Sequence, residues 1–237
     1  MKIRPRQPET TSPMLSILEP YTLFFVDMDD TLFEERQYVL SGFHAIANYV
    51  ARWGLRSDEV WLFLQQHFET SGREKIFDHL LQHFFGTVRS ELIQELVWVY
   101  RDHVPQIQLY PDAAETLKAL RSKGRVIIVT DGLTSVQERK FAALELDRLV
   151  DRVVFCDAMG FPKPDPSSLR GRVEQGVRNA LIIGDRPDHD LALAAALGLD
   201  SVRVRTGRFH DVDNQPWKPI ADLPKISSLL GPDPTDT

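Results

Sequence analysis

Cysteine and long apolar stretches are nearly absent from this chain. Cys156 is the only cysteine among 237 residues, so no disulfide can form within the chain. No segment approaches the roughly 20 apolar residues that span a bilayer, and the first 20 residues hold no apolar run of the signal-peptide type. We therefore expect a cytoplasmic protein that has no membrane partner.

Positive charge is also scarce. Lys and Arg number 28 against 34 Asp and Glu, which gives a net charge of −6. Nucleic-acid-binding surfaces are usually basic, so no nucleic-acid partner is expected. The sequence contains neither a P-loop nor a G-x-G-x-x-G pattern, and therefore gives no support for ATP or dinucleotide binding. An anionic small substrate stays compatible with this charge, because a bound metal can reverse the field of a pocket.

Five short apolar runs have the length and composition of buried parallel strands. These runs are residues 23–26, 126–129, 153–155, 181–183 and 202–204. Helical patterns follow the second, third and fourth runs, and a further helix is expected between Pro111 and Gly124. Strands that alternate with helices predict an α/β fold, in which a doubly wound, Rossmann-like parallel sheet forms the core.

Residues 35–106 break this alternation. Four helices are expected here, at 36–53, 57–68, 73–85 and 89–103, and they contain more than half of the chain's Phe, Tyr and Trp residues. An insert so rich in aromatic side chains can bury a small core of its own. Because the insert leaves the sheet directly after the first strand, it can fold back as a lid over the end of that strand.

The sequence thus divides into a core and an insert. The expected core domain comprises residues 21–34 and 107–230, and residues 35–106 form a helical cap domain. Residues 1–20, with four prolines among polar residues, predict a loose N-terminal arm, and residues 231–237 predict a C-terminal tail.

The first strand ends in three carboxylates, Asp27, Asp29 and Asp30. In open α/β sheets, ligands bind outside the carboxyl ends of the strands. Acids this close together repel one another unless a cation or a shared proton offsets the repulsion. The pattern predicts a divalent metal site in which one carboxylate is free to act as a nucleophile or as an acid/base.

Three further polar motifs follow later strands. They are Thr130-Asp131-Gly132 after the second strand, Lys163 after the third, and Gly184-Asp185 after the fourth, with Asp190 five residues farther along. Phosphoryl transfer needs an aligned nucleophile, a metal that neutralises phosphate oxygens, and donors around the remaining oxygens. Carboxylates, a hydroxyl, backbone N–H groups and a lysine at neighbouring strand ends supply these groups.

The four motifs closely resemble, in order and spacing, those of the haloacid dehalogenase-like (HAD) hydrolase superfamily. In this chain they are D-M-D-D-T, T-D-G, K-P-D-P and G-D-R-P-D-H-D, and the resemblance extends from about residue 21 to about residue 205. Two positions depart from the family pattern. Arg186 stands where a serine is frequent, and Asp131 stands where an asparagine is frequent.

The resemblance implies a role for each motif residue. Asp27 is the expected nucleophile and Asp29 the expected acid/base. The phosphoryl group is expected to contact Thr130, Asp131, Gly132 and Lys163, of which Thr130 and Lys163 also take part in catalysis. Mg²⁺ is the implied cofactor. Its expected ligands are Asp27, Asp185 and the backbone carbonyl of Asp29, and Asp190 would support the metal or the lysine.

Simpler interpretations of the same residues stay open. Asp27 and Asp29 could cap a turn, and Thr130 could cap a turn or helix. Asp190 could be the N-cap of the helix that follows it, and Lys163 could be a surface lysine.

Other polar residues receive structural roles. Thr134 and Gln137 resemble a helix capping box. His79 and His83 are expected on a polar helix face, since no third zinc ligand is evident, and Cys156 is expected to be a small buried hydrophobe. The remaining residues are expected to be solvated or ion-paired: Asp188, Arg203, Arg205, Arg208 and His210.

The sequence therefore predicts a Mg²⁺-dependent phosphatase that hydrolyses a small phosphorylated metabolite through an aspartyl-phosphate. A phosphomutase on the same scaffold, a dehalogenase and a non-catalytic interaction module are the alternatives. Glu35, Arg36 and Arg73 of the insert are candidates for substrate contact. The sequence does not indicate an oligomeric state.

Overall fold

The computed structural model describes residues 17–169, 171 and 179–231. Within them, six parallel strands form one sheet in the order β3-β2-β1-β4-β5-β6. The strands are β1 (Leu23–Val26), β2 (Arg125–Thr130), β3 (Arg152–Phe155), β4 (Ala180–Gly184), β5 (Asp200–Val204) and β6 (Ala221–Leu223). The predicted doubly wound α/β fold is confirmed. β6 was not expected, because its three residues are too few to show a pattern.

β1 is a central strand of the sheet. Its residue Phe24 lies in register with Val126 of β2 and Leu181 of β4, and all three side chains are buried. β2 and β3 lie on one side of β1, whereas β4, β5 and β6 lie on the other. The winding of the chain therefore reverses at β1, and a ligand crevice is expected outside the carboxyl end of a strand at such a switch point.

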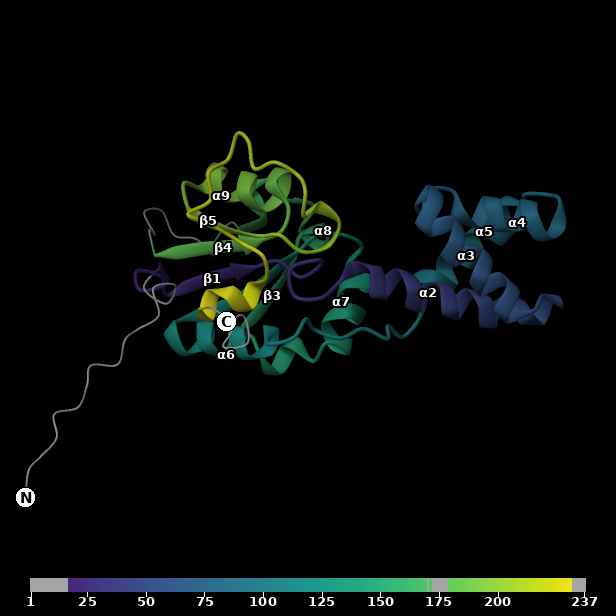
Figure 1. Cartoon of the computed structure of the whole chain (residues 1–237), viewed down its shortest axis with the longest axis horizontal. Coiled ribbons are helices and arrows are strands. Elements are labelled where there is room, and N and C mark those ends of the chain that lie inside the picture. Colours follow the sequence, from purple (N-terminus) through teal and green to yellow (C-terminus); the bar gives the residue numbers. More distant parts are fainter. Residues whose placement is uncertain (1–16, 170, 172–178, 232–237) are drawn as a thin grey trace, which may run out of the picture.

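Helices cover both faces of the sheet, as Figure 1 shows. Alternate residues of β1 point to opposite faces: Phe24 packs in one cluster with Leu117, and Phe25 packs in another with Leu193. The first face is covered by α6 (Ala113–Lys123), α7 (Thr134–Ala143) and η6 (Ile226–Leu230). The second face is covered by α8 (Cys156–Met159), η3 (Pro166–Leu169) and α9 (Ala192–Leu197). Short helical turns complete the core: η2 (Leu146–Arg148), η4 (Pro187–Leu191) and η5 (Gly207–Phe209).

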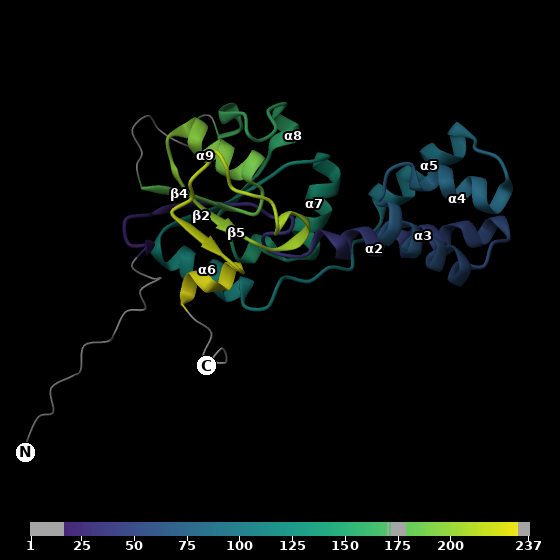
Figure 2. The ribbon, with the colours of Figure 1, turned by 45° about the horizontal axis from the view of Figure 1, so that its top comes forward.

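The insert forms a helical lobe beyond one end of the sheet (Figures 1 and 2). Its helices are α2 (Glu35–Val50), η1 (Ala51–Trp53), α3 (Ser57–Ser71), α4 (Ile76–Phe85) and α5 (Ser90–Asp102). They bury a hydrophobic core of their own, which includes Phe43, Ile46 and Leu80. The four expected helices are present. However, α4 begins at Ile76 and not at residue 73, because Lys75 has a left-handed backbone conformation with a φ of 51°.

Both connections between the lobe and the sheet are held by hydrogen bonds. The Tyr110 N–H donates to the Leu32 carbonyl over 2.8 Å. The Gln108 N–H donates to the Gln37 side chain over 2.8 Å. Asp102 of α5 also forms an ion pair with Arg139 of α7. The root of the lobe is therefore fixed next to the carboxyl end of β1.

The expected terminal segments lie mostly outside the described residues, which exclude residues 1–16 and 232–237. Leu18 already packs in the core cluster of the sheet and is buried. No described helix has the length and apolar character needed to cross a membrane.

Candidate active site

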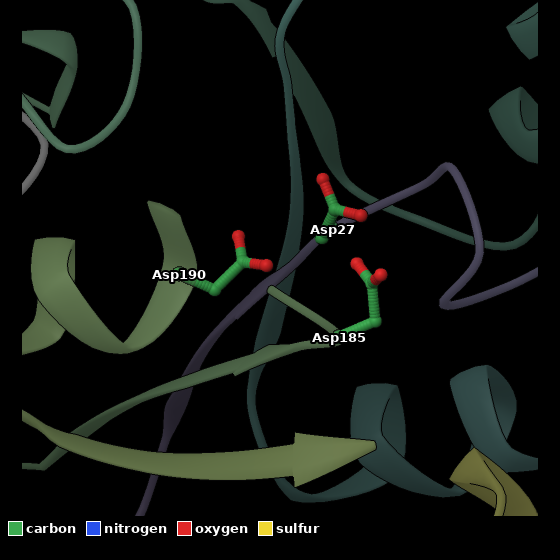
Figure 3. A group of neighbouring side chains, drawn as sticks. All are labelled: Asp27, Asp185 and Asp190. Atoms are coloured by element: carbon green, nitrogen blue, oxygen red, sulfur yellow. The ribbon is translucent and has the colours of Figure 1, made fainter. Parts of the chain in front are cut away.

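Three buried carboxylates meet at the carboxyl ends of neighbouring strands. Asp27 directly follows β1, Asp185 directly follows β4, and Asp190 lies in η4. One carboxylate oxygen from each residue lies within 4.8 Å of the other two, and Figure 3 shows the three groups turned toward one another. The exposed fractions of these residues are only 7%, 2% and 1% in the same order. Parallel pairing of β1 with β4 therefore brings together acids that are far apart in the sequence.

Lys163 bridges two of these acids. Its Nζ lies 2.5 Å from Asp27 Oδ1 and 2.7 Å from Asp190 Oδ1. The lysine is itself buried, with 5% of its surface exposed. A buried charge without a partner is costly, so each member of this group depends on the others.

The carboxylates carry more negative charge than Lys163 alone can balance. Burial raises the pKa of Asp27 above its usual range despite the opposing charge of Lys163. Burial, followed by the charges of Asp27 and Asp190, also raises the pKa of Asp185. Burial acts to lower the pKa of Lys163, but Asp190 and Asp27 outweigh it and hold that pKa well above its usual value.

This group of residues fits a hard divalent cation. Mg²⁺ prefers oxygen ligands at about 2.1 Å, so two of its ligands lie at most about 4.2 Å apart, close to the spread of oxygens observed here. In addition, Asp185 Oδ2 is buried and accepts no hydrogen bond from the described residues. A cation would satisfy this oxygen and reduce the repulsion among the acids.

Asp29 lines the same cavity, and two side chains of α7 hold its carboxylate. Its Oδ1 accepts a hydrogen bond from Lys140 Nζ over 2.6 Å, and its Oδ2 accepts one from Gln137 Nε2 over 2.6 Å. Asp29 is therefore not among the three side chains that share oxygens at metal-binding spacing.

The second motif adjoins this cavity, which has a volume of about 230 Å³. Thr130 ends β2 and is buried. Asp131 and Gly132 line the cavity together with Lys163. Asp131 Oδ1 accepts a hydrogen bond from the backbone N–H of Lys163 over 3.0 Å, so Asp131 fixes the loop that carries the lysine.

A sequence profile described as haloacid dehalogenase-like hydrolase matches residues 21–198, which is more than half of the chain. The chain belongs to this family of hydrolases. The resemblance noted from the motifs is thus confirmed over the segment that supplies the strands β1 to β4 and all of the carboxylates described above.

Individual relatives of this HAD hydrolase differ in their named activities. It is 26% identical over 200 residues to the glyceraldehyde 3-phosphate phosphatase of Methanocaldococcus jannaschii, across 81% of this chain and 88% of that protein. It is 29% identical over 147 residues to the (S)-2-haloacid dehalogenase 4A of Burkholderia cepacia, across 60% of this chain and 62% of that protein. The crystal structure of the HAD hydrolase YfnB from Bacillus subtilis, bound to magnesium, matches 88% of this chain and 96% of that chain. Its TM-score of 0.64 at 20% identity shows a common fold.

A larger cavity of about 590 Å³ lies beside the first, between the lobe and the core of the HAD hydrolase. All three expected substrate-contact residues, Glu35, Arg36 and Arg73, line it, and Glu35 and Arg73 also line the smaller cavity. Glu35 accepts a hydrogen bond from Arg73 over 3.0 Å and lies 3.9 Å from the guanidinium of Arg208. Arg36 forms an ion pair with Glu69.

The expected capping box of Thr134 and Gln137 is wrong, and so is the alternative in which Asp190 is a helix N-cap. Thr134 begins α7, but it forms no capping box with Gln137: the Thr134 backbone N–H donates to Asp157 Oδ2 over 3.3 Å, and the Gln137 amide donates to Asp29. Asp190 is not the N-cap of α9. It lies inside η4, where its Oδ2 accepts a hydrogen bond from the Arg186 N–H over 3.0 Å. Both polar side chains are drawn into tertiary contacts that local sequence patterns do not reveal.

The expectation for Arg203 is wrong, because this residue is buried and forms no ion pair with any residue that the structure describes. Its side chain is fully buried and donates to Asn214 Oδ1 over 2.5 Å and to the Phe209 carbonyl over 2.7 Å. The acceptors, Asn214 and the Phe209 carbonyl, belong to the segment between β5 and β6, which packs onto Arg203 and was not predicted to do so. Arg205 does pair with Asp222, at 2.8 Å, as expected.

The other structural assignments are confirmed where the structure tests them. Cys156 is buried in the core, where burial raises its pKa to about 12. The His79 ring packs against His67, and the His83 ring stacks on Phe63. Among the described residues, the three aspartates form the only cluster of His, Cys, Asp or Glu with metal-binding spacing.

A methyl group at Gly184 should disturb the carboxylate group. A Cβ at this position would lie 2.2 Å from Asp190 Cγ, so Gly184→Ala must displace the acid that binds Lys163. We expect a loss of about 1–3 kcal/mol in the free energy of unfolding, which denaturant titration measures. Gly198→Ala is the control, because its Cβ would contact nothing even though its φ of 67° is strained. A loss for Gly184→Ala that is no larger than the loss for Gly198→Ala would contradict this expectation.

The raised pKa values predict how pH changes stability. In the unfolded chain, aspartates lose their protons near a pKa of about 4. In the folded state, Asp27 and Asp185 keep theirs to higher pH. Without metal, the free energy of unfolding should therefore fall as the pH rises from about 4, the unfolded pKa, to about 10, the folded pKa of Asp185. Because Mg²⁺ would bind the deprotonated acids, it should raise the melting temperature more at about pH 9 than at about pH 7.

Asp185→Asn is the matched variant for this experiment. It removes one of the repelling charges and one expected metal ligand, so both the pH dependence and the response to Mg²⁺ should shrink. If Mg²⁺ shifted the melting temperature of the parent and of this variant by the same amount, the metal would bind elsewhere.

Proposed function

We propose that this HAD hydrolase is a Mg²⁺-dependent phosphatase, which hydrolyses a small phosphorylated metabolite through an aspartyl-phosphate at Asp27. The observation that carries the proposal is the convergence of Asp27, Asp185 and Asp190 on one point, with Lys163 between them. Relatives named as phosphatases support the reaction type. The magnesium-bound state of the related YfnB structure supports the metal.

Each residue has a defined part in this reaction. Asp27 attacks phosphorus with the carboxylate oxygen that Lys163 does not hold. Lys163 and the Thr130 hydroxyl stabilise the negative charge on the phosphoryl oxygens. Asp29 gives a proton to the leaving oxygen and later takes one from the attacking water. Mg²⁺, held by Asp27 and Asp185, would neutralise charge on the phosphate.

The surroundings of the site indicate a small substrate. The two adjoining cavities of about 230 and 590 Å³ are of the size that small metabolites occupy. We propose that residues 35–106 act as a cap and that the leaving part of the substrate contacts Glu35 and Arg73. The lobe has its own hydrophobic core, so it can move as a unit over the cavity.

A dehalogenase is the second candidate, because one relative carries that name. Displacement of a halide needs a nucleophilic carboxylate but neither a metal nor a proton donor for the leaving group. Asp29, held at the cavity by two hydrogen bonds, favours the phosphatase.

Asp27→Asn tests the nucleophile. We expect phosphate release from p-nitrophenyl phosphate in the presence of Mg²⁺ to fall on the order of 10³-fold or more, because the amide cannot form the acyl phosphate. Asp147→Asn, which changes an exposed acid of η2 that does not line the cavity, should leave release unchanged.

The alternatives give different outcomes in the same assay. Retained phosphate release by the Asp27→Asn variant would refute the nucleophile. Halide release from a 2-haloacid in the presence of a chelator would support the dehalogenase. Transfer of phosphate to a second position of a sugar phosphate would support the mutase, and no turnover of any ester would favour a non-catalytic module.

A further inference from the structure

The helix α7 buries polar side chains where apolar ones are usual. Its two buried residues are Gln137 and Lys140, with exposed fractions of 2% and 4%. A buried lysine is unfavourable unless it is paired, and a buried amide is unfavourable unless it is hydrogen-bonded. Both residues therefore need partners, and their partners lie in the candidate active site.

The two side chains hold the carboxylate of Asp29 from both sides. Lys140 Nζ lies 2.6 Å from Asp29 Oδ1, and Gln137 Nε2 lies 2.6 Å from Asp29 Oδ2. Because each oxygen has a separate donor, the carboxylate cannot rotate without breaking one of the hydrogen bonds. Each oxygen still has a second lone pair available for a ligand in the cavity.

Gln137 also connects Asp29 with the second motif. Its Nε2 lies 2.8 Å from Thr130 Oγ1 and also contacts the Asp131 carbonyl. A hydroxyl oxygen that accepts a hydrogen bond keeps its own proton for another acceptor. The amide has two protons for three close acceptors, so Gln137 shares them among Asp29, Thr130 and the Asp131 carbonyl.

Aromatic rings restrict the position of Lys140. Its ammonium lies 4.5 Å from the centre of the Tyr38 ring and 5.9 Å from that of the Phe33 ring. Both distances are within the range of cation–π attraction. Tyr38 belongs to α2, so the position of the lysine depends on the helical lobe as well as on the core.

We propose that Lys140 and Gln137 are positioning residues, which aim Asp29 at the leaving group and at the hydrolytic water. This inference rests on the proposed phosphatase function. When Asp27 bonds to phosphorus, the bond from phosphorus to the leaving oxygen breaks, and the proton on Asp29 passes to that oxygen. When water attacks the aspartyl-phosphate, its proton passes to Asp29, the bond from phosphorus to Asp27 breaks, and both carboxylates return to their starting states.

Lys140→Met and Gln137→Leu test this proposal through two esters of similar size. Benzyl phosphate releases an alkoxide that needs a proton, whereas p-nitrophenyl phosphate releases a stabilised phenolate that needs little help. We expect Lys140→Met to lower kcat/KM for benzyl phosphate about 100-fold, with a much smaller loss for p-nitrophenyl phosphate. Gln137→Leu should show the same pattern, with a larger loss of kcat/KM for benzyl phosphate than for p-nitrophenyl phosphate. Lys140→Arg, which keeps the charge and the donors, should recover part of the activity toward benzyl phosphate.

Lys118→Met is the matched control, because it makes the same change at an exposed lysine of α6 that pairs with Glu115. It should leave both esters unaffected. Equal losses for the two esters in the Lys140 and Gln137 variants would overturn the proposal and indicate a purely structural role. A gain of activity would also overturn it, because it would mean that the two residues hold Asp29 away from the substrate. Turnover of p-nitrophenyl phosphate by the parent tests the proposed function separately, so the two failures can be distinguished.

Discussion

Electrostatic repulsion among buried carboxylates is the constraint around which this structure is organised. Asp27, Asp185 and Asp190 converge from two strands and a helical turn, and Lys163 provides the buried positive charge between two of them. Removing Lys163 would leave its two buried acid partners without a compensating charge, which costs several kcal/mol. A folded chain accepts such an arrangement only where the rest of the fold holds the groups in place. The strand β4, which is buried throughout, and β1, which is buried from Phe24 to Val26, do so here.

The core and the helical lobe divide the work around this charged centre. The sheet supplies the acids and the lysine from the ends of its strands, where parallel pairing fixes their spacing. The lobe adds Glu35 and Arg73 at the outer wall of the same cavity. α7 connects the two parts, since it holds Asp29 through its buried face and pairs with α5 through Arg139. In the proposed function, the core would supply the reacting groups and the lobe would contact the substrate, and α7 touches both units.

Much of this organisation was predictable from the sequence, for identifiable reasons. The run from Leu23 to Val26 ends in Asp27, so the strand boundary and the first acid are marked by the same change of residue type. The carboxyl ends of parallel strands share one edge of a sheet, so the later motifs could be assigned to a common site before any coordinates were known. The aromatic-rich insert likewise indicated a second hydrophobic core.

The errors arose where long-range contacts outweigh local patterns. Gln137 fits a capping box, but its amide is engaged by Asp29, which is more than one hundred residues away in the sequence. Arg203 alternates with valines as an exposed residue would, yet it is buried and donates hydrogen bonds to Phe209 and Asn214 in the segment that follows β5. The pairing of Lys140 with Asp29 gave no local signal, because a lysine on a helix is normally solvated.

The hydrogen bond between Tyr110 and Leu32 has a consequence for motion. It ties the outgoing and returning chain together at the base of the lobe, so a swing of the four helices would pivot about this point. Leu32 is only five positions beyond Asp27, and the arc traced by the tip of the lobe would therefore be large while the nucleophile hardly shifts. Entry and exit of small molecules could then be regulated without loosening the charged centre.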